Sequence, residues 1–575
     1  MSARLARPLL VTGLLALLFA CSSERETDSL LRHVPAQTPY AFVVDRRLPE
    51  GLRQRMADYY AAQLAAQRPL FTRMRTQVEQ QPGHDDMALR ARVMFDVLDA
   101  LFAEFEGRDT AAALSELGFE PVTRSLLFGI GPLPALRVEI LDAERFGAML
   151  DRIEHRAGVR AQRGELDGQS YRRIDLGAVD LVLAVTPQHM VSGLLVDARF
   201  DADLPLLLGH RLPSDSLADN GDMARLVERH GLSGYGEGFV RIDELLAIAL
   251  GRGSEDSRAV MQALGGDPLS VSAGCGRLLQ STVAAMPRLA IGVSAADDEH
   301  MAMRAILEST PAVASRLQKL AAPVPGLGSA YDGLFAFGVG LNLPQLRNAI
   351  DGLLRHIAAE GTECEWVDPE RLQAITPQLN IALGPMTAGI KGFTLRVEDL
   401  ALDPQTLSVA DVSAGMIAAV DDPRGIFALG AMFNPALAAL QVPDDGRFVD
   451  LPQAPMLADQ APPMRVAIRD RALLLLAGGA SDKLADGLLA AVDVATQPAP
   501  LLAVDYGVQQ LVQRLGDVFD QTVERLEAEG ESELAVEMRD QFASFRLQAR
   551  LFERLRLALH ANEQGLVMEQ AMRLK

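Results

Sequence analysis

Two stretches of the sequence come close to catalytic or nucleotide-binding patterns. Gly231-Leu232-Ser233-Gly234-Tyr235 differs from Gly-x-Ser-x-Gly, because Tyr235 stands where the tight turn around a nucleophilic serine needs glycine. Residues 478–483, Gly-Gly-Ala-Ser-Asp-Lys, lack the glycine directly before lysine and the Ser or Thr after it that a phosphate-binding loop needs. We therefore predict no catalytic residue here, and expect residues 478–483 to join a strand ending near Ala477 to a helix beginning near Lys483.

Three acidic stretches offer oxygen ligands for a metal ion. His84-Asp85-Asp86 lies between two helical stretches, and a solvated turn with a helix N-cap explains it better than a metal site, which needs more converging ligands. Residues 421–425 and 444–446 are expected to be turns, since neither fits the longer alternating pattern of a calcium loop. The sequence therefore predicts no metal site and no cofactor.

The chain has three cysteines, and the first of them, Cys21, ends a distinctive N-terminal series. Arg4 and Arg7 supply positive charge, residues 9–20 form an apolar run, and polar residues follow from Ser22. This order is typical of a secretory signal. The apolar run is shorter than the roughly 20 residues that span a bilayer.

Leu18-Phe19-Ala20-Cys21 resembles the lipobox of bacterial lipoproteins, although small or β-branched residues usually occupy the position of Phe19. The resemblance implies cleavage before Cys21 and a diacylglycerol on its sulfur. Ser22 stands where Asp would mark retention in the inner membrane, so the resemblance implies the periplasmic face of the outer membrane. The alternatives are an ordinary signal peptide with a Cys near the cut, or a cytoplasmic protein with an apolar N-terminus.

Length and charge limit the class of protein. The 575 residues, or 555 without the leader, exceed one ordinary hydrophobic core, so two or more domains are expected. The formal net charge is −21, and it becomes −23 when Arg4 and Arg7 are removed with the leader. Such a chain is repelled by nucleic acid and by anionic headgroups. We therefore expect no nucleic-acid partner, and membrane contact through the N-terminal lipid.

Cys275 and Cys364 remain after Cys21, and in an oxidising periplasm they are expected to form a disulfide. The two cysteines are 89 residues apart, and chain-entropy arguments predict that closing this loop stabilises the folded state by roughly 4–5 kcal/mol. The bond would also cross the boundary between two predicted halves and restrict hinge motion. The alternative is two buried free thiols. After Pro377, Leu379-Asn380-Ile381 is expected to be a strand.

Three local signals occur twice in the same order. The first is a strand followed by a helix that begins Leu-Pro, the second is another strand leading into a helix, and the third is a hairpin whose alternating residues flank a polar turn. They lie at residues 41–53, 238–246 and 288–307, and again at 335–347, 501–515 and 556–574. This order predicts an internal duplication, although strand-to-helix turns occur in any α+β chain.

The predicted organisation is a signal peptide (1–20), a tether (21–30), a first half (31–320), a linker rich in Pro and Gly (321–329) and a second half (330–575). Each half is expected to be α+β, an antiparallel sheet with helices packed on one face. Between the first two strand signals of the first half, Met94, Leu98, Leu101 and Phe105 share one face of a long helix.

A lipid-bearing Cys, a brief tether and Val34-Pro35-Ala36-x-Thr38-Pro39-Tyr40 resemble the opening of uncharacterised envelope lipoproteins of Gram-negative bacteria, and this resemblance implies no activity. Our first hypothesis is a non-enzymatic binding or scaffold protein of the envelope. A second is a binder of a small or lipid-like ligand between the two halves, and a third is a hydrolase with dispersed residues. A deep apolar cavity would favour the second, and a polar cleft with a Ser-His pair the third.

The leader generates the first testable prediction. Mass spectrometry of the mature N-terminus is expected to find an acylated Cys21, and globomycin is expected to block cleavage before it. A free, unacylated Cys21 would contradict the lipoprotein hypothesis.

Overall fold

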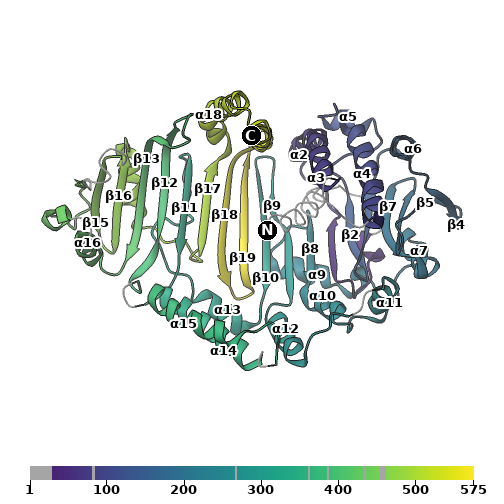
Figure 1. Cartoon of the computed structure of the whole chain (residues 1–575), viewed down its shortest axis with the longest axis horizontal. Helices are drawn as coiled ribbons and strands as arrows, with labels where there is room; N and C mark the ends of the chain where they lie inside the picture. Colours follow the sequence, from purple (N-terminus) through teal and green to yellow (C-terminus); the bar gives the residue numbers. More distant parts are fainter. Residues whose placement is uncertain are drawn as a thin grey trace. The chain divides into compact units, whose positions relative to one another are not determined.

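The computed structural model describes residues 29–79, 85–265, 268–360, 363–384, 387–432, 435–452 and 462–575. Cys21, the predicted leader and His84 lie outside these residues, so the expectations for them remain predictions. The chain forms two compact units. The first runs to Ser270 and adds Pro287–Arg304, and the second comprises Val271–Met286 and Ala305–Lys575. Both mix helices with strands that pair antiparallel, which is an α+β fold (Figure 1).

The sheet of the first unit has the strand order β4-β5-β6-β7-β3-β2-β1-β8-β9. Its strands are β1 (Tyr40–Val44), β2 (Ser125–Ile130), β3 (Leu133–Glu139), β4 (Gln162–Leu166), β5 (Gln169–Asp175), β6 (Val179–Val185), β7 (His189–Val196), β8 (Glu237–Arg241) and β9 (Arg288–Ala296). The chain passes into the second unit within β10 (His300–Glu308), which completes a hairpin with β9.

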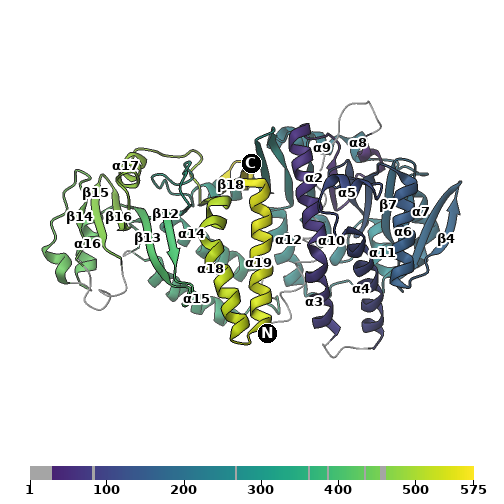
Figure 2. The ribbon, with the colours of Figure 1, turned by 90° about the horizontal axis from the view of Figure 1, so that it is seen from above.

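The helices of the first unit fall between these strands. They are α2 (Glu50–Ala65), α3 (Gln67–Glu79), α4 (Asp85–Phe105), α5 (Ala111–Ser115), α6 (Ala143–Ala157), α7 (Phe200–Leu208), α8 (Leu217–Asn220), α9 (Asp222–His230), α10 (Ile242–Ala249) and α11 (Glu255–Ala263), with short 3-10 turns at Leu30–His33 and Asp197–Arg199. In Figure 2, α4 returns alongside α2 and α3. Phe71 lies against Phe95, with 5.6 Å between ring centroids, and Arg68 Nε is 3.2 Å from Asp99 Oδ1.

Local sequence fixes the ends of α6. The side chain of Asp142 accepts hydrogen bonds from the backbone N–H groups of Glu144 and Arg145, both at 3.0 Å, and so caps the first turn. Gly158 ends the helix in the left-handed conformation, with φ of 66°, which glycine adopts without steric cost. Phe146, Met149 and Ile153 repeat at helical spacing, and this stripe is the buried face of α6.

Helices contact both faces of the first unit's sheet. Leu136 and Val138 of β3 point toward α6, whereas Arg137 points the other way and donates to the carbonyls of Leu207 and Leu208 in α7. This differs from the expectation of helices on one face. Along β6 and β7, the residues that point to one face of the sheet and those that point to the other are both largely apolar. Each face is therefore covered by helices.

The sheet of the second unit has the strand order β14-β15-β16-β13-β12-β11-β17-β18-β19. Its strands are β11 (Phe335–Gly340), β12 (Ile390–Leu402), β13 (Val409–Val420), β14 (Val449–Asp450), β15 (Met464–Arg469), β16 (Ala472–Gly478), β17 (Leu502–Gly507), β18 (Phe552–Asn562) and β19 (Gly565–Leu574).

The helices of the second unit are α12 (Ala273–Ala285), α13 (Pro311–Gln318), α14 (Leu343–Glu360), α15 (Pro369–Ala382), α16 (Pro423–Ala431), α17 (Asp482–Ala491), α18 (Val508–Ala528) and α19 (Ser532–Leu551), with a 3-10 turn at Pro435–Ala439. The last two run side by side (Figure 2), and the rings of Phe519 and Phe542 stack with centroids 4.5 Å apart. Leu484 and Leu488 of α17 pack on Ile417, Leu474 and Leu476 of the sheet.

The two sheets share one pattern of pairing. The first strand of each unit, β1 or β11, lies between the next strand along the chain and a late strand, β8 or β17. The third strand, β3 or β13, pairs with the last strand of a meander, β7 or β16. The predicted strands at 41–44, 335–341, 238–243 and 501–505 are confirmed, as are the two hairpins.

The predicted linker, residues 321–329, belongs to the second unit. Val324 and Leu327 are buried and pack with Ala419 and Ala503, and the N–H of Gly326 donates to the carbonyl of Val494 at 3.2 Å. Pro and Gly do prevent regular structure here, but the apolar residues between them join the core.

Cys275 and Cys364 form the predicted disulfide, with 4.4 Å between their Cα atoms. Both residues are buried, and next to them the hydroxyl of Ser272 donates to the carbonyl of Glu363 at 2.6 Å. Because α12 belongs to the second unit, the bond lies within that unit. The expected restriction of hinge motion between two halves therefore loses its basis, and the bond instead ties α12 to the segment before α15.

The disulfide generates a stability prediction. Replacing Cys275 and Cys364 with alanine is expected to lower the free energy of unfolding of the second unit by about 2–4 kcal/mol, because the unfolded chain loses a long closed loop. Urea titration followed by circular dichroism measures this, with a Cys21→Ala variant as control. Alkylation of either cysteine without reductant would contradict the bond.

Candidate functional site

A cavity of about 720 Å³ lies inside the first unit, between one face of the sheet and helices α2, α4 and α6. Twenty of its 24 lining residues are apolar. The strands contribute Phe42, Leu127, Pro134, Leu136, Val138, Ile174, Leu183 and Met190, and the helices contribute Leu64, Val97, Leu101, Phe105, Phe146, Met149, Leu150 and Ile153. The position expected for a ligand site, between two halves, is therefore not where this cavity lies.

Strand register builds the floor of the cavity. Phe42 of β1 is opposite Leu127 of β2, and Leu127 is opposite Leu136 of β3, so the three side chains stand in a row on one face. The neighbour of Leu127, Leu126, points to the other face and is 0% exposed. At Gly238, opposite Phe42, an added Cβ would lie 2.2 Å from the phenylalanine ring, so glycine leaves room for that ring.

The helical wall follows from spacing. Val97, Leu101 and Phe105 occur at intervals of four on α4, so all three face the sheet. Phe119 bridges the two helices, with its ring 5.8 Å from that of Phe105 and 6.2 Å from that of Phe146. The sequence had placed Leu101 and Phe105 on one helical face. Their role as a cavity wall could not be read from that pattern, which also describes a packed core.

Two of the four polar residues that line the cavity are Tyr40 and Glu120. The hydroxyl of Tyr40 donates to the carbonyl of Pro132 at 3.2 Å, and burial raises the pKa of Tyr40, so it remains protonated. Glu120 forms an ion pair with Arg53. Burial raises the pKa of Glu120, against the opposing effect of Arg53.

The other two are Glu154 of α6 and Arg172 of β5. Arg172 Nε lies 2.7 Å from Glu154 Oε1, but the N–H does not point at that oxygen, so the contact is an ion pair without an aligned hydrogen bond. Arg172 also donates to Asp151 at 2.8 Å, and Arg163 donates to both carboxylates at 3.1 Å. The hydrogen bond from Arg172 is the main cause that lowers the pKa of Asp151.

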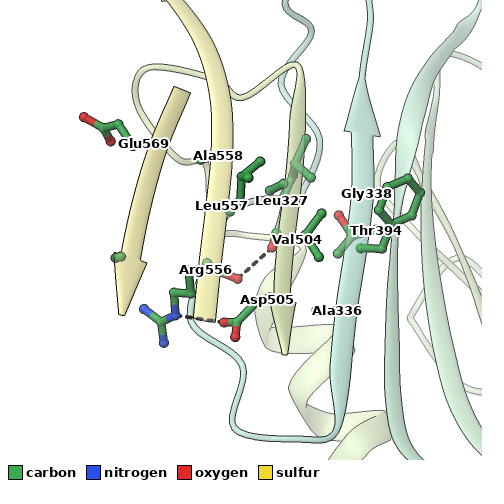
Figure 3. A pocket seen from close by; sticks show the side chains of 16 residues that line it. Leu327, Ala336, Gly338, Thr394, Val504, Asp505, Arg556, Leu557, Ala558 and Glu569 are labelled. Carbon is green, nitrogen blue, oxygen red and sulfur yellow. Dashed lines mark hydrogen bonds and ion pairs between the residues drawn. The ribbon is translucent and has the colours of Figure 1, made fainter. Parts of the chain in front are cut away.

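The second unit contains a smaller cavity of about 150 Å³ (Figure 3). Asp505 lines it, and Figure 3 shows its carboxylate joined to Arg556, whose Nε donates at 2.8 Å. Asp505 also accepts from Arg554 and from the backbone N–H of Tyr331 at 3.2 Å. A buried carboxylate with these partners stabilises the fold and is not free to act as a base.

A Ser-His pair joins two helices of the second unit. Ser281 Oγ of α12 lies 3.1 Å from His356 Nε2 of α14, and its hydroxyl is also within hydrogen-bond distance of the carbonyl of Leu278 at 3.1 Å. Neither residue lines either of the two cavities. The pair links α12 to α14, outside both of these cavities.

The stretches singled out in the sequence have structural roles. Gly231 ends α9 with φ of 60°, and the hydroxyl of Ser233 donates to the carbonyl of Val293 at 2.8 Å. Residues 478–483 join β16 to α17 as predicted, with Ser481 accepting from the N–H of Leu484 at 3.1 Å. Residues 421–425 were expected to be a turn, but residues 423–425 begin α16, and Asp422 caps this helix by accepting from the N–H of Gly425 at 3.0 Å. In residues 444–446, Asp445 accepts from the N–H of Arg447 at 3.0 Å.

A single group of Cys, His, Asp or Glu residues has ligand atoms close enough to hold a metal ion, within the part of the chain that the structure describes. It consists of Cys275, Cys364 and Glu365. The disulfide occupies both sulfurs, so the group is not available as a metal site. Trp366, which follows, is 57% exposed.

Comparison with protein-family models, with curated proteins and with solved structures found no match. Across the described residues, no helix combines the length and apolar character needed to cross a membrane. The large apolar cavity is therefore the feature from which a function is best argued.

The cavity generates a prediction with a matched control. Leu127→Trp places a larger ring in empty space and is expected to leave the melting temperature unchanged or higher. Leu126→Trp, one residue earlier, forces the same ring into the packed opposite face and is expected to cost about 1–3 kcal/mol or more. Differential scanning calorimetry of both variants measures this. Equal destabilisation would contradict the cavity.

Proposed function

We propose that this protein is a non-enzymatic binder of an apolar, lipid-like ligand, which it holds in the cavity of the first unit. The observation that carries this proposal is the combination of volume and lining, about 720 Å³ with 20 apolar residues. Ligand pockets usually have about 300–1,000 Å³ and a mostly apolar lining. A methylene group transferred into such a site contributes about 0.8 kcal/mol.

The lining favours binding over catalysis. The polar groups in it are already engaged in ion pairs or hydrogen bonds, so they are suited to orient a ligand rather than to transfer protons. Met149 and Met190 add flexible side chains that adapt to different chain shapes. A pure scaffold would have no use for an apolar cavity of this size, and each empty volume of this kind weakens packing.

The N-terminal series extends the proposal to a place in the cell. If Cys21 carries a lipid, the protein is held at the periplasmic face of the outer membrane and holds its ligand there. The strongly negative net charge supports contact through the lipid rather than through a basic surface.

An internal duplication also belongs to this proposal. It is supported by the shared pairing pattern of β1, β2, β3 and β8 with β11, β12, β13 and β17. Val34-Pro35-Ala36 before β1 and Val324-Pro325-Gly326 before β11 add a similar local sequence with a buried valine in both units. The ligand site then belongs to one copy of the repeat.

Binding is tested with the neutral fluorescent probe N-phenyl-1-naphthylamine and protein stripped of bound lipid. We expect saturable binding of one probe per chain, and at least ten-fold weaker binding to Leu127→Trp because the larger ring projects from the cavity floor into the space that the probe occupies. Leu212→Trp, at an exposed position of the same unit, is expected to bind like the unmodified protein.

Two results would contradict the proposal. One is the absence of saturable probe binding. The other is binding that Leu127→Trp leaves unchanged, which would place the probe elsewhere. A pull-down of the acylated protein from envelope extract distinguishes the ligand binder from the scaffold alternative. A scaffold is expected to bring down protein partners without a bound lipid.

A further inference from the structure

The charges beside the cavity limit the polar end that a ligand can carry. Three charged side chains line it, Glu120, Glu154 and Arg172, and each is paired. The only cation among them is Arg172, so its availability decides whether an anionic headgroup has a partner within the cavity.

Arg172 forms ion pairs with two carboxylates. It contacts Glu154 at 2.7 Å and Asp151 at 2.8 Å, and its side chain is largely buried. Arg163 shares the same two carboxylates, so the four side chains together carry no net charge. An anion could reach Arg172 only in competition with these two carboxylates, and Glu154, the more buried of the two, would repel it.

The surroundings of Glu120 are more negative. Arg53 is shared between Glu120 and Glu50, and the nearby Arg47 pairs with Glu139, with 3.4 Å between their charged atoms. This set contains three carboxylates and two guanidinium groups. A ligand carboxylate or phosphate placed here would meet a surplus of negative charge in a partly desolvated position.

We propose that the ligand is uncharged, a long hydrocarbon chain that ends in a hydroxyl, an ester or no polar group. This inference builds on the proposed function, because it assumes that the cavity is the binding site. It excludes the ionised forms of fatty acids and of phosphate-bearing lipids from the cavity.

The test compares two ligands of equal chain length, 1-dodecanol and dodecanoate, as competitors of N-phenyl-1-naphthylamine at pH 8, where dodecanoate is ionised. We expect dodecanol to displace the probe at a concentration at least ten-fold lower than dodecanoate does. Glu154→Gln releases Arg172 from one carboxylate. We expect this variant to lower the concentration of dodecanoate that displaces the probe at least three-fold, and to leave the concentration of dodecanol unchanged.

Glu144→Gln is the matched control, since Glu144 is exposed on the same helix and is expected to change neither ligand. If the melting temperature shows that Glu154→Gln is unfolded, Glu120→Gln provides a second comparison, because it removes one negative charge from the cavity lining.

The possible failures are distinguishable. Equal displacement by dodecanol and dodecanoate, with probe binding still weakened at least ten-fold by Leu127→Trp, overturns the inference about charge and keeps the binding function. If the unmodified protein does not bind the probe, both the binding function and the inference are overturned. An equal gain for both ligands in Glu154→Gln also overturns the inference, because it shows a change of shape rather than of charge.

Discussion

The alternation of side chains along the strands of the first unit is the constraint on which its structure depends. Leu126 and Leu127 are adjacent in the chain, yet Leu126 is completely buried on one face of the sheet and Leu127 lines the cavity on the other. Because the side-chain period of a strand is two, a shift of register by one residue would exchange these faces. The same alternation sends Arg137 to the carbonyls of α7 and Leu136 toward α6.

The two faces of this sheet therefore differ in packing rather than in polarity. Both are apolar, but on one face Leu126, Phe128 and Phe239 are almost completely buried, beside smaller residues such as Ala41. On the other face Leu127 and Leu136 line the cavity, and Phe105 and Phe146 line it from the helices. The lining is otherwise apolar except for Tyr40 and two ion pairs, in which Glu120 pairs with Arg53 and Glu154 with Arg172.

The sequence allowed the strands, the hairpins and the disulfide to be predicted, because these depend on local alternation, on turns and on a cysteine pair. Leu379-Asn380-Ile381 was predicted as a strand, but it lies in α15, which continues past Pro377. The linker prediction rested on Pro and Gly alone and missed that Val324 and Leu327 are buried. The cavity could not be predicted, since it requires the register of β1, β2 and β3 and the distance of α4 and α6 from them.

The most direct measurement is native mass spectrometry of the protein secreted without a lipidation site, as a chain that begins at Ser22, and purified without delipidation. We expect a non-covalently bound, uncharged hydrophobic molecule in the unmodified chain and its loss in Leu127→Trp. A ligand-free mass for the unmodified chain, or a bound molecule that Leu127→Trp retains, would contradict the claim that the cavity of the first unit is a lipid-binding site.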